Sequence, residues 1–234
     1  SFWSFSGNRK FWGSNCVDIY SERTRRSLNS ARIYIIEASY RLRASLREAD
    51  MTAPIILAVD TPDFDTANRW IEATRENISV YKLGLEFFIN FGKEGIRAVT
   101  ENSDAKIFLD LKLHDIPNTV GHAAQNAATL NPLFLTVHAS GGSSMVSAAV
   151  NAAPHVGITA VTILTSLSED ELFRVGFANP ALESAVALAE LATSAGAQAI
   201  VCSPLEIAAI RAVVSSEVKI ITPGVRPAGT EGGD

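Results

Sequence analysis

Cysteine is scarce in this sequence, and long apolar runs are absent. The 234 residues include two cysteines, Cys16 and Cys202, whose separation matches neither a disulfide framework nor a zinc site and favours a reducing, cytoplasmic setting. No apolar run approaches the roughly 18 residues of a spanning helix, so no membrane segment is predicted. Acidic residues (25) outnumber basic ones (20), and the net charge of -5 argues against nucleic acid as the main partner.

The first fifty residues differ from the remainder in charge. Residues 1–50 hold nine basic and five acidic residues, whereas the remainder holds 11 basic and 20 acidic ones. This segment lacks the apolar core of a secretory signal, and its acidic residues argue against a mitochondrial transit peptide. A modest helical pattern covers residues 31–47, and residues 23–47 could form a basic amphipathic helix. We interpret residues 1–50 as an appended or upstream-translated segment outside the fold, and residues 51–234, beginning at Met51, as one domain.

From Met51 onward, apolar runs alternate with helical patterns. Strands are predicted at residues 55–60, 80–85, 106–112, 133–139, 157–165, 198–203 and 218–222. Helices are predicted at residues 63–77, 86–100, 117–130, 143–152, 181–195 and 204–214. Strands that are apolar on both faces and alternate with helices predict a parallel sheet covered by helices.

The polar residues near the strand ends indicate how this sheet is arranged. No G-x-G-x-x-G follows the first strand, which argues against a dinucleotide-binding sheet. In a (β/α)8 barrel the carboxyl ends of the strands converge on one mouth, where active sites lie. We therefore predict an α/β fold of the (β/α)8 TIM type, incomplete with about seven βα units, and we expect two exposed sheet edges where the eighth unit is missing. The polar residues at or beyond these ends are Asp60, Lys82, Asp110, Lys112, His138, Thr165, Ser203 and Arg226.

The stretch from Lys106 to Val120, KIFLDLKLHDIPNTV, concentrates the candidate chemistry. Asp110 and Lys112 are two residues apart, so they share one face of a strand. Asp115 falls where the strand gives way to a helix that Pro117 can begin. Such charges are costly to gather unless they pair, and they favour perturbed pKa values and proton chemistry. A surface ion-pair network is the alternative.

Metal binding is a second alternative for this stretch. Asp110, His114 and Asp115 could ligate a metal, but Lys112 between them would compete with a cation. His138, within an apolar strand, is better interpreted as a hydrogen-bonded core histidine than as a metal ligand.

The string DLKLHDIPNT at residues 110–119 resembles the signature of the orotidine 5'-phosphate decarboxylase family of the bacterial type. The resemblance covers residues 53–234 and none of residues 1–50. It continues through LAVD (57–60), YKLGLE (81–86), TVHASGG (136–142), TILTS (162–166) and TPGVRPAGTEGGD (222–234). It implies decarboxylation of orotidine 5'-monophosphate to UMP and carbon dioxide in de novo pyrimidine synthesis. It also implies no metal, no organic cofactor, and a homodimer with shared active sites.

The same resemblance implies roles for individual residues. Lys112 would donate a proton to C6, and Asp110 and Asp115 would flank it, with Asp115 coming from the other subunit. Lys82 would complete the charge array and contact the ribose. The remaining expected substrate-binding residues are Asp60 at the ribose, Ile116, Pro117 and Thr119 in the neighbouring subunit's site, Thr165 near the pyrimidine, and Arg226 at the phosphate.

Two other functions remain open on the sequence. The D-x-K-x-x-D core is shared with Mg²⁺-dependent sugar-phosphate enzymes of the same barrel superfamily, such as ketogulonate-phosphate decarboxylases and hexulose-phosphate synthases, which chelation would inactivate. The family's glutamine after GTEGGD and its phosphate-binding glycine–arginine pair are missing. The chain could therefore be an inactive fragment that only binds ligand weakly or dimerises.

Overall fold

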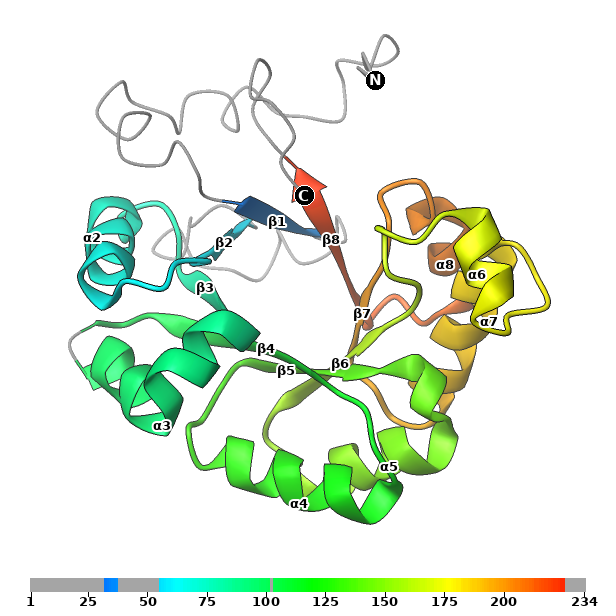
Figure 1. Cartoon of the computed structure of the whole chain (residues 1–234), viewed down its shortest axis with the longest axis horizontal. Helices are drawn as coiled ribbons and strands as arrows, with labels where there is room; N and C mark the ends of the chain where they lie inside the picture. Colours follow the sequence, from blue (N-terminus) through cyan, green and yellow to red (C-terminus); the bar gives the residue numbers. More distant parts are fainter. Residues whose placement is uncertain (1–31, 38–54, 102, 226–234) are drawn as a thin grey trace, which may run out of the picture.

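Seven parallel strands in sequential order form the centre of the molecule (Figure 1). The structure, a computed structural model, describes residues 32–37, 55–101 and 103–225. Each of the seven strands pairs in parallel with the next one along the chain, and the curled sheet confirms the predicted incomplete (β/α)8 barrel. The strands are β2 (Ile55–Ala58), β3 (Val80–Gly84), β4 (Lys106–Leu113), β5 (Phe134–His138), β6 (Gly157–Val161), β7 (Ala199–Val201) and β8 (Lys219–Val225).

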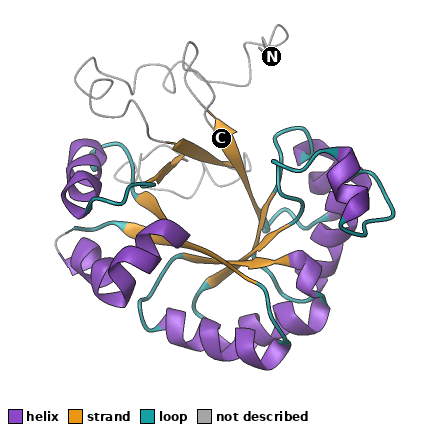
Figure 2. Cartoon of the chain, in the orientation of Figure 1, coloured by secondary structure: helices purple, strands orange, loops and turns teal. Residues whose placement is uncertain are grey.

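Helices follow the strands and cover the outer face of the sheet (Figure 2). They are α2 (Phe64–Thr74), α3 (Leu85–Glu101), α4 (Pro117–Ala128), α5 (Ser143–Ala152), α6 (Glu169–Arg174), α7 (Ala181–Ser194) and α8 (Ile207–Val213), with a short 3₁₀ turn at Ala139–Gly141. Helix α6 was not predicted, although Ser168 and Glu171 form a capping box at its start, which is a recognisable start signal. Its six residues are too few to show a helical period.

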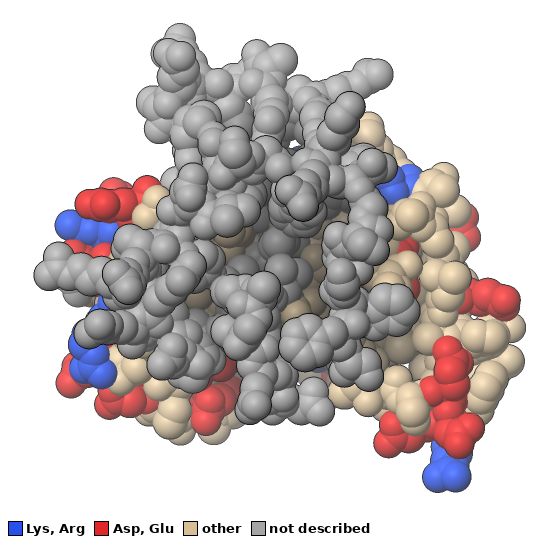
Figure 3. Space-filling view, turned by 90° about the horizontal axis from the view of Figure 1, so that it is seen from above, with Lys and Arg blue, Asp and Glu red and all other residues tan. Residues whose placement is uncertain are grey.

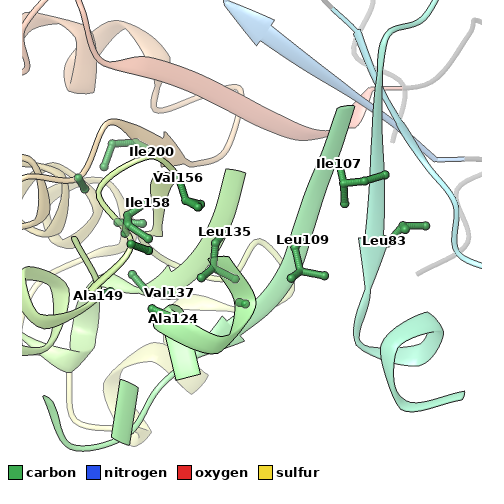
Figure 4. Close-up of a cluster of buried hydrophobic side chains, with 14 of the residues drawn as sticks. Leu83, Ile107, Leu109, Ala124, Leu135, Val137, Ala149, Val156, Ile158 and Ile200 are labelled. Carbon is green, nitrogen blue, oxygen red and sulfur yellow. The ribbon is translucent and has the colours of Figure 1, made fainter. Parts of the chain in front are cut away.

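The buried apolar side chains form two clusters, one outside the ring of strands and one inside it. The larger cluster lies between the strands and the helices, and Figure 4 shows part of it, including Leu83, Leu109, Leu135 and Ile200. Side chains alternate along a strand, so the neighbouring residues point into the barrel. There a second cluster contains Ile56, Val80, Phe108, Phe134, Val161, Ala199, Val201 and Ile221. This inner cluster forms the apolar floor below the strands' carboxyl ends.

Strand β1 (Arg32–Glu37) lies between the two edges of the parallel sheet. It pairs antiparallel with both, placing Ile35 opposite Ile55 of β2 and Thr222 of β8. The expected helix over residues 31–47 and the expected exposed edges are therefore wrong at this position, and residues 32–37 do not stand outside the fold. The segment RIYIIE is rich in β-branched and aromatic residues, and two unpaired edges offer it backbone partners on both sides. The rest of residues 1–50 lies outside the described residues.

On the face shown in Figure 3, a group of acidic side chains lies together at the lower right edge. Among the described residues on that face, acidic and basic side chains lie at the periphery and form no continuous basic patch. Within the described part of the chain, none of the helices combines the length and the apolar character that crossing a membrane requires.

Proline in place of Ile35 tests whether β1 closes the ring of strands. Proline has no N–H and breaks a ladder when it lies between two strands. We expect Ile35→Pro to lower the free energy of unfolding by about 1–3 kcal/mol and to accelerate hydrogen exchange along β2 and β8. The control Ile35→Val keeps the backbone N–H, so the amides of β2 and β8 should remain protected from hydrogen exchange. Equal exchange in the wild type and the proline variant would show that β1 does not pair there.

Candidate active site

Four charged side chains of alternating sign line the carboxyl ends of β2, β3 and β4. Val80 and Phe108 belong to the inner cluster, so Lys82 and Asp110, two residues further along, also face the barrel interior. The Lys82 Nζ atom lies 2.8 Å from Asp60 Oδ1 and 3.6 Å from Asp110 Oδ2. The Lys112 Nζ atom lies 2.8 Å from both carboxylate oxygens of Asp110. The structure thus brings four of the predicted site residues into one array.

The inner members of this array are buried, and the outer members reach the mouth. Lys82 and Asp110 are 3% and 5% exposed, whereas the side chains of Lys112 and Asp60 are 31% and 32% exposed. Burial by itself raises the pKa of the Asp110 carboxyl. The ammonium groups of Lys82 and Lys112, with hydrogen bonds from Lys112 and Thr136, outweigh burial and hold the Asp110 pKa below its ordinary value. The buried carboxylate therefore stays ionised because cations lie on both sides of it.

The backbone at Lys112 leaves the regular strand conformation. Its φ of 48° lies in the left-handed region, which a non-glycine residue rarely adopts. The β4–β5 register shifts between Leu109 and Leu113, as expected for a bulge, and bulges redirect side chains near active sites. The Lys112 backbone N–H donates to Thr136 Oγ1 at 2.8 Å. The Thr136 hydroxyl on β5 thus accepts a hydrogen bond from the main chain at Lys112, where the strand is irregular.

Glycine at position 84 leaves room for the Lys82–Asp60 pair. A Cβ added at Gly84 would lie 3.3 Å from Lys82 Nζ and 3.5 Å from Asp60 Oδ1. The first of these distances is tighter than ordinary van der Waals contact. A side chain at position 84 would therefore require the Lys82 ammonium to shift by a few tenths of an ångström.

The residues after β4 lie apart from this array within a single chain. Asp115 is exposed, and its Oδ1 accepts a hydrogen bond from the Ile116 backbone N–H at 2.6 Å. Ile116 is 64% exposed, and Pro117 begins α4. Thr119 is exposed on the first turn of α4, and Thr165 is exposed beyond β6. Arg226 lies outside the described residues.

Two histidine rings lie beside the array. His138 ends β5, and its ring centroid is 5.3 Å from that of His114. Burial, followed by the neighbouring His114 and Lys112, lowers the pKa of His138, with Asp110 acting in the opposite direction. Its imidazole is therefore neutral over a wider pH range than that of an exposed histidine.

Comparisons with known proteins identify the family of this chain. A model of the "Orotidine 5'-phosphate decarboxylase / HUMPS family" matches residues 53–234. The chain belongs to this family. The orotidine 5'-phosphate decarboxylase of Thermobifida fusca strain YX is 53% identical over 184 residues, covering 79% of this chain and 79% of the relative. The enzyme of that name from Frankia casuarinae is 43% identical over 199 residues, covering 78% of this chain and 73% of the relative.

Solved structures also resemble the chain. The crystal structure of orotidine 5'-phosphate decarboxylase from Lactobacillus acidophilus matches with a TM-score of 0.62 and 33% identity, covering 69% of this chain and 76% of that one. An uncharacterized conserved protein from Geobacillus kaustophilus matches with a TM-score of 0.65 and 30% identity, covering 70% and 79%. These likenesses accord with the predicted family and with the barrel seen here.

Two residues at the site of this family member were not identified from the sequence. Thr136 is a polar residue in the apolar run LFLTVHA, two positions before His138, and strand alternation could have placed it at the mouth. Gly84 lies inside the strand VYKLG, and an isolated glycine in a strand often marks close approach of another group. Neither signal shows which group in the site the residue contacts.

The lowered pKa of His138 predicts a pH dependence of stability. The folded chain binds this proton less well than the unfolded chain, so its stability increases with pH. The contribution is complete above the ordinary pKa of 6.5 and is lost as the pH falls through the folded-state value. Urea unfolding between about pH 8 and about pH 5 measures this slope. We expect His138→Gln to flatten it and the exposed control His122→Gln to leave it unchanged; equal slopes in all three proteins would contradict the assignment.

Proposed function

We propose that this chain decarboxylates orotidine 5'-monophosphate to UMP and carbon dioxide in pyrimidine biosynthesis. Family membership and the curated relatives at 53% and 43% identity support this reaction. The observation that carries it is the Lys112 ammonium, fixed on the Asp110 carboxylate at the barrel mouth. That arrangement presents a cation and a proton to a ligand entering the barrel.

Lys112 is the proposed proton donor. When the bond between C6 and the carboxylate breaks, its electron pair remains on C6, and carbon dioxide departs. No adjacent π system delocalises that pair, so the site must stabilise a localised negative charge. An ammonium already held in place does so with little reorganisation. Transfer of a proton from Nζ to C6 then completes UMP, and solvent returns a proton to the amine.

Asp110 is proposed to lie beside the substrate's carboxylate. Two neighbouring carboxylates repel each other, and this repulsion is relieved as carbon dioxide leaves. Lys82 holds Asp110 from the other side at 3.6 Å. The Asp110 carboxylate therefore remains in place while the substrate reacts.

The remainder of the substrate is assigned to residues around the mouth. Asp60 and Lys82 are proposed to bind ribose hydroxyls, Thr165 to lie near the pyrimidine, and Arg226 to bind the phosphate. Contacts with a group remote from C6 can still lower the barrier, because their binding energy orders the reacting end. We propose that the reaction needs no metal or organic cofactor.

We further propose that two subunits share each active site. Asp115 is exposed and outside the array of its own chain, and the apolar side chain of the next residue, Ile116, is exposed as well. Burial of that side chain against a second subunit would remove its apolar surface from water. In this proposal Asp115, with Ile116, Pro117 and Thr119, completes the site of the neighbouring subunit in a homodimer. The proposed location is the cytoplasm, with no nucleic-acid partner and no membrane partner.

Replacing Lys112 tests the proton-donor role. We expect Lys112→Ala to lower kcat for orotidine 5'-monophosphate by at least about a thousand-fold, because it removes the acid together with its charge. The control Lys106→Ala changes an exposed lysine at the opposite end of the same strand and should retain full activity. Loss of the substrate's ultraviolet absorbance measures turnover, and circular dichroism verifies folding.

Chelation separates this function from the metal-dependent alternative. With EDTA in the assay, the rate should be unchanged, whereas a Mg²⁺-dependent sugar-phosphate enzyme would lose activity. Near wild-type turnover by Lys112→Ala would overturn the proton-donor assignment. A folded wild-type chain that does not turn over the substrate would overturn the proposed function.

Mixing two inactive variants tests the shared site. Lys112→Ala and Asp115→Asn alter one residue in each half of the proposed site, so each homodimer should be inactive. A mixed dimer would contain one site with neither substitution. After subunit exchange in equal amounts, we expect about a quarter of wild-type activity to return, because half of the dimers are mixed and each has one intact site. Mixing Lys112→Ala with Asp110→Asn, both on the same side of the site, should restore none.

A further inference from the structure

Thr136 connects the two residues at the centre of the array through one hydroxyl group. Its side chain is fully buried on β5. The Thr136 hydroxyl donates to Asp110 Oδ1 at 3.0 Å and accepts from the Lys112 backbone N–H at 2.8 Å. One rigid β-branched side chain thus contacts both the carboxylate of the array and the main chain of its outer lysine.

Each of these hydrogen bonds restrains a different part of the array: one restrains the orientation of the Asp110 carboxylate, and the other restrains the backbone at Lys112. Lys112 contacts both carboxylate oxygens of Asp110 and Lys82 contacts Oδ2, but both ammonium groups end long side chains with several rotatable bonds. The neutral hydroxyl adds a third, directional contact at Oδ1. At Lys112 the backbone adopts a φ of 48°, a conformation that persists only where surrounding groups enforce it. The hydrogen bond to Thr136 is such a contact, since the register of the strand pair shifts there.

We propose that Thr136 is a positioning residue for the decarboxylation: it fixes the direction of the Asp110 carboxylate and the backbone from which Lys112 reaches the substrate. This inference rests on the proposed function and adds a residue to it. Thr136 acts through Asp110 and Lys112 rather than on the substrate. Its removal should therefore affect the chemical step more than substrate binding.

A neighbouring threonine provides a matched control. Thr159 on β6 is the register partner of Thr136 and is equally buried. Its hydroxyl donates to the carbonyl of Gly157 on its own strand at 3.0 Å. Replacing either threonine with valine removes a buried hydroxyl at nearly constant volume, but only position 136 contacts the array.

Steady-state kinetics of three variants of the full chain test the proposal. We expect Thr136→Val to lower kcat by about 10- to 100-fold with KM changed by less than about threefold, as for a slight misplacement of reacting groups. Thr136→Ser keeps the hydroxyl and should recover most of kcat, and Thr159→Val should match the wild type within about twofold. Unchanged kcat in Thr136→Val, no recovery in Thr136→Ser, or an equal loss in Thr159→Val would each overturn it.

A measurement independent of turnover separates this inference from the proposed function. Hydrogen exchange at the Lys112 amide should accelerate in Thr136→Val and remain slow in Thr136→Ser and Thr159→Val. If the wild type does not decarboxylate the substrate, the proposed function and the catalytic role of Thr136 both fail, whatever the exchange data show. If the wild type is active but exchange at Lys112 is equal in all variants, only the positioning role fails.

Discussion

A buried carboxylate held between two ammonium groups is the constraint around which this barrel is arranged. Asp110 is 5% exposed, and an ionised carboxyl in such a place is strongly disfavoured unless cations and hydrogen bonds surround it. Lys82 from β3, Lys112 from β4 and Thr136 from β5 supply them. Because three strands contribute, the charge can be tolerated only if those strands are in their observed register.

On β4 and β5 the side chains that face the barrel interior change from apolar to polar along the strand, and this change satisfies the constraint. Phe108 and Phe134 pack edge to face, with ring centroids 5.8 Å apart, in the inner apolar floor. Asp110 and Thr136 follow two residues later on the same strands, so the floor fixes the height at which the polar layer begins. Water is excluded below that layer and admitted above it. The field of the array is consequently stronger inside the barrel than at an exposed ion pair.

The fold was largely predictable because the helices and strands after Met51 are long enough to show their periods. Helix α5 was predicted at its observed bounds, and β4 ended one residue later than predicted. The strand at Arg32–Glu37 was not predicted, because its pairing depends on two distant sheet edges rather than on local pattern. Likewise, the contact of Thr136 with Lys112 depends on a bulge that alternation does not reveal. Asp115 stays outside the array of its own chain, and its role remains a prediction.

The unequal exposure of the two lysines fits the different tasks proposed for them. Lys82 is buried between Asp60 and Asp110, where movement would leave two carboxylates without their shared cation. Lys112 has its backbone fixed by Thr136, yet its side chain remains 31% exposed. Only its side-chain torsions are then free to follow a substrate. A proton donor that starts near its final position has little reorganisation left to perform during the reaction, and such preorganisation is the largest contribution that an electrostatic site makes to catalysis.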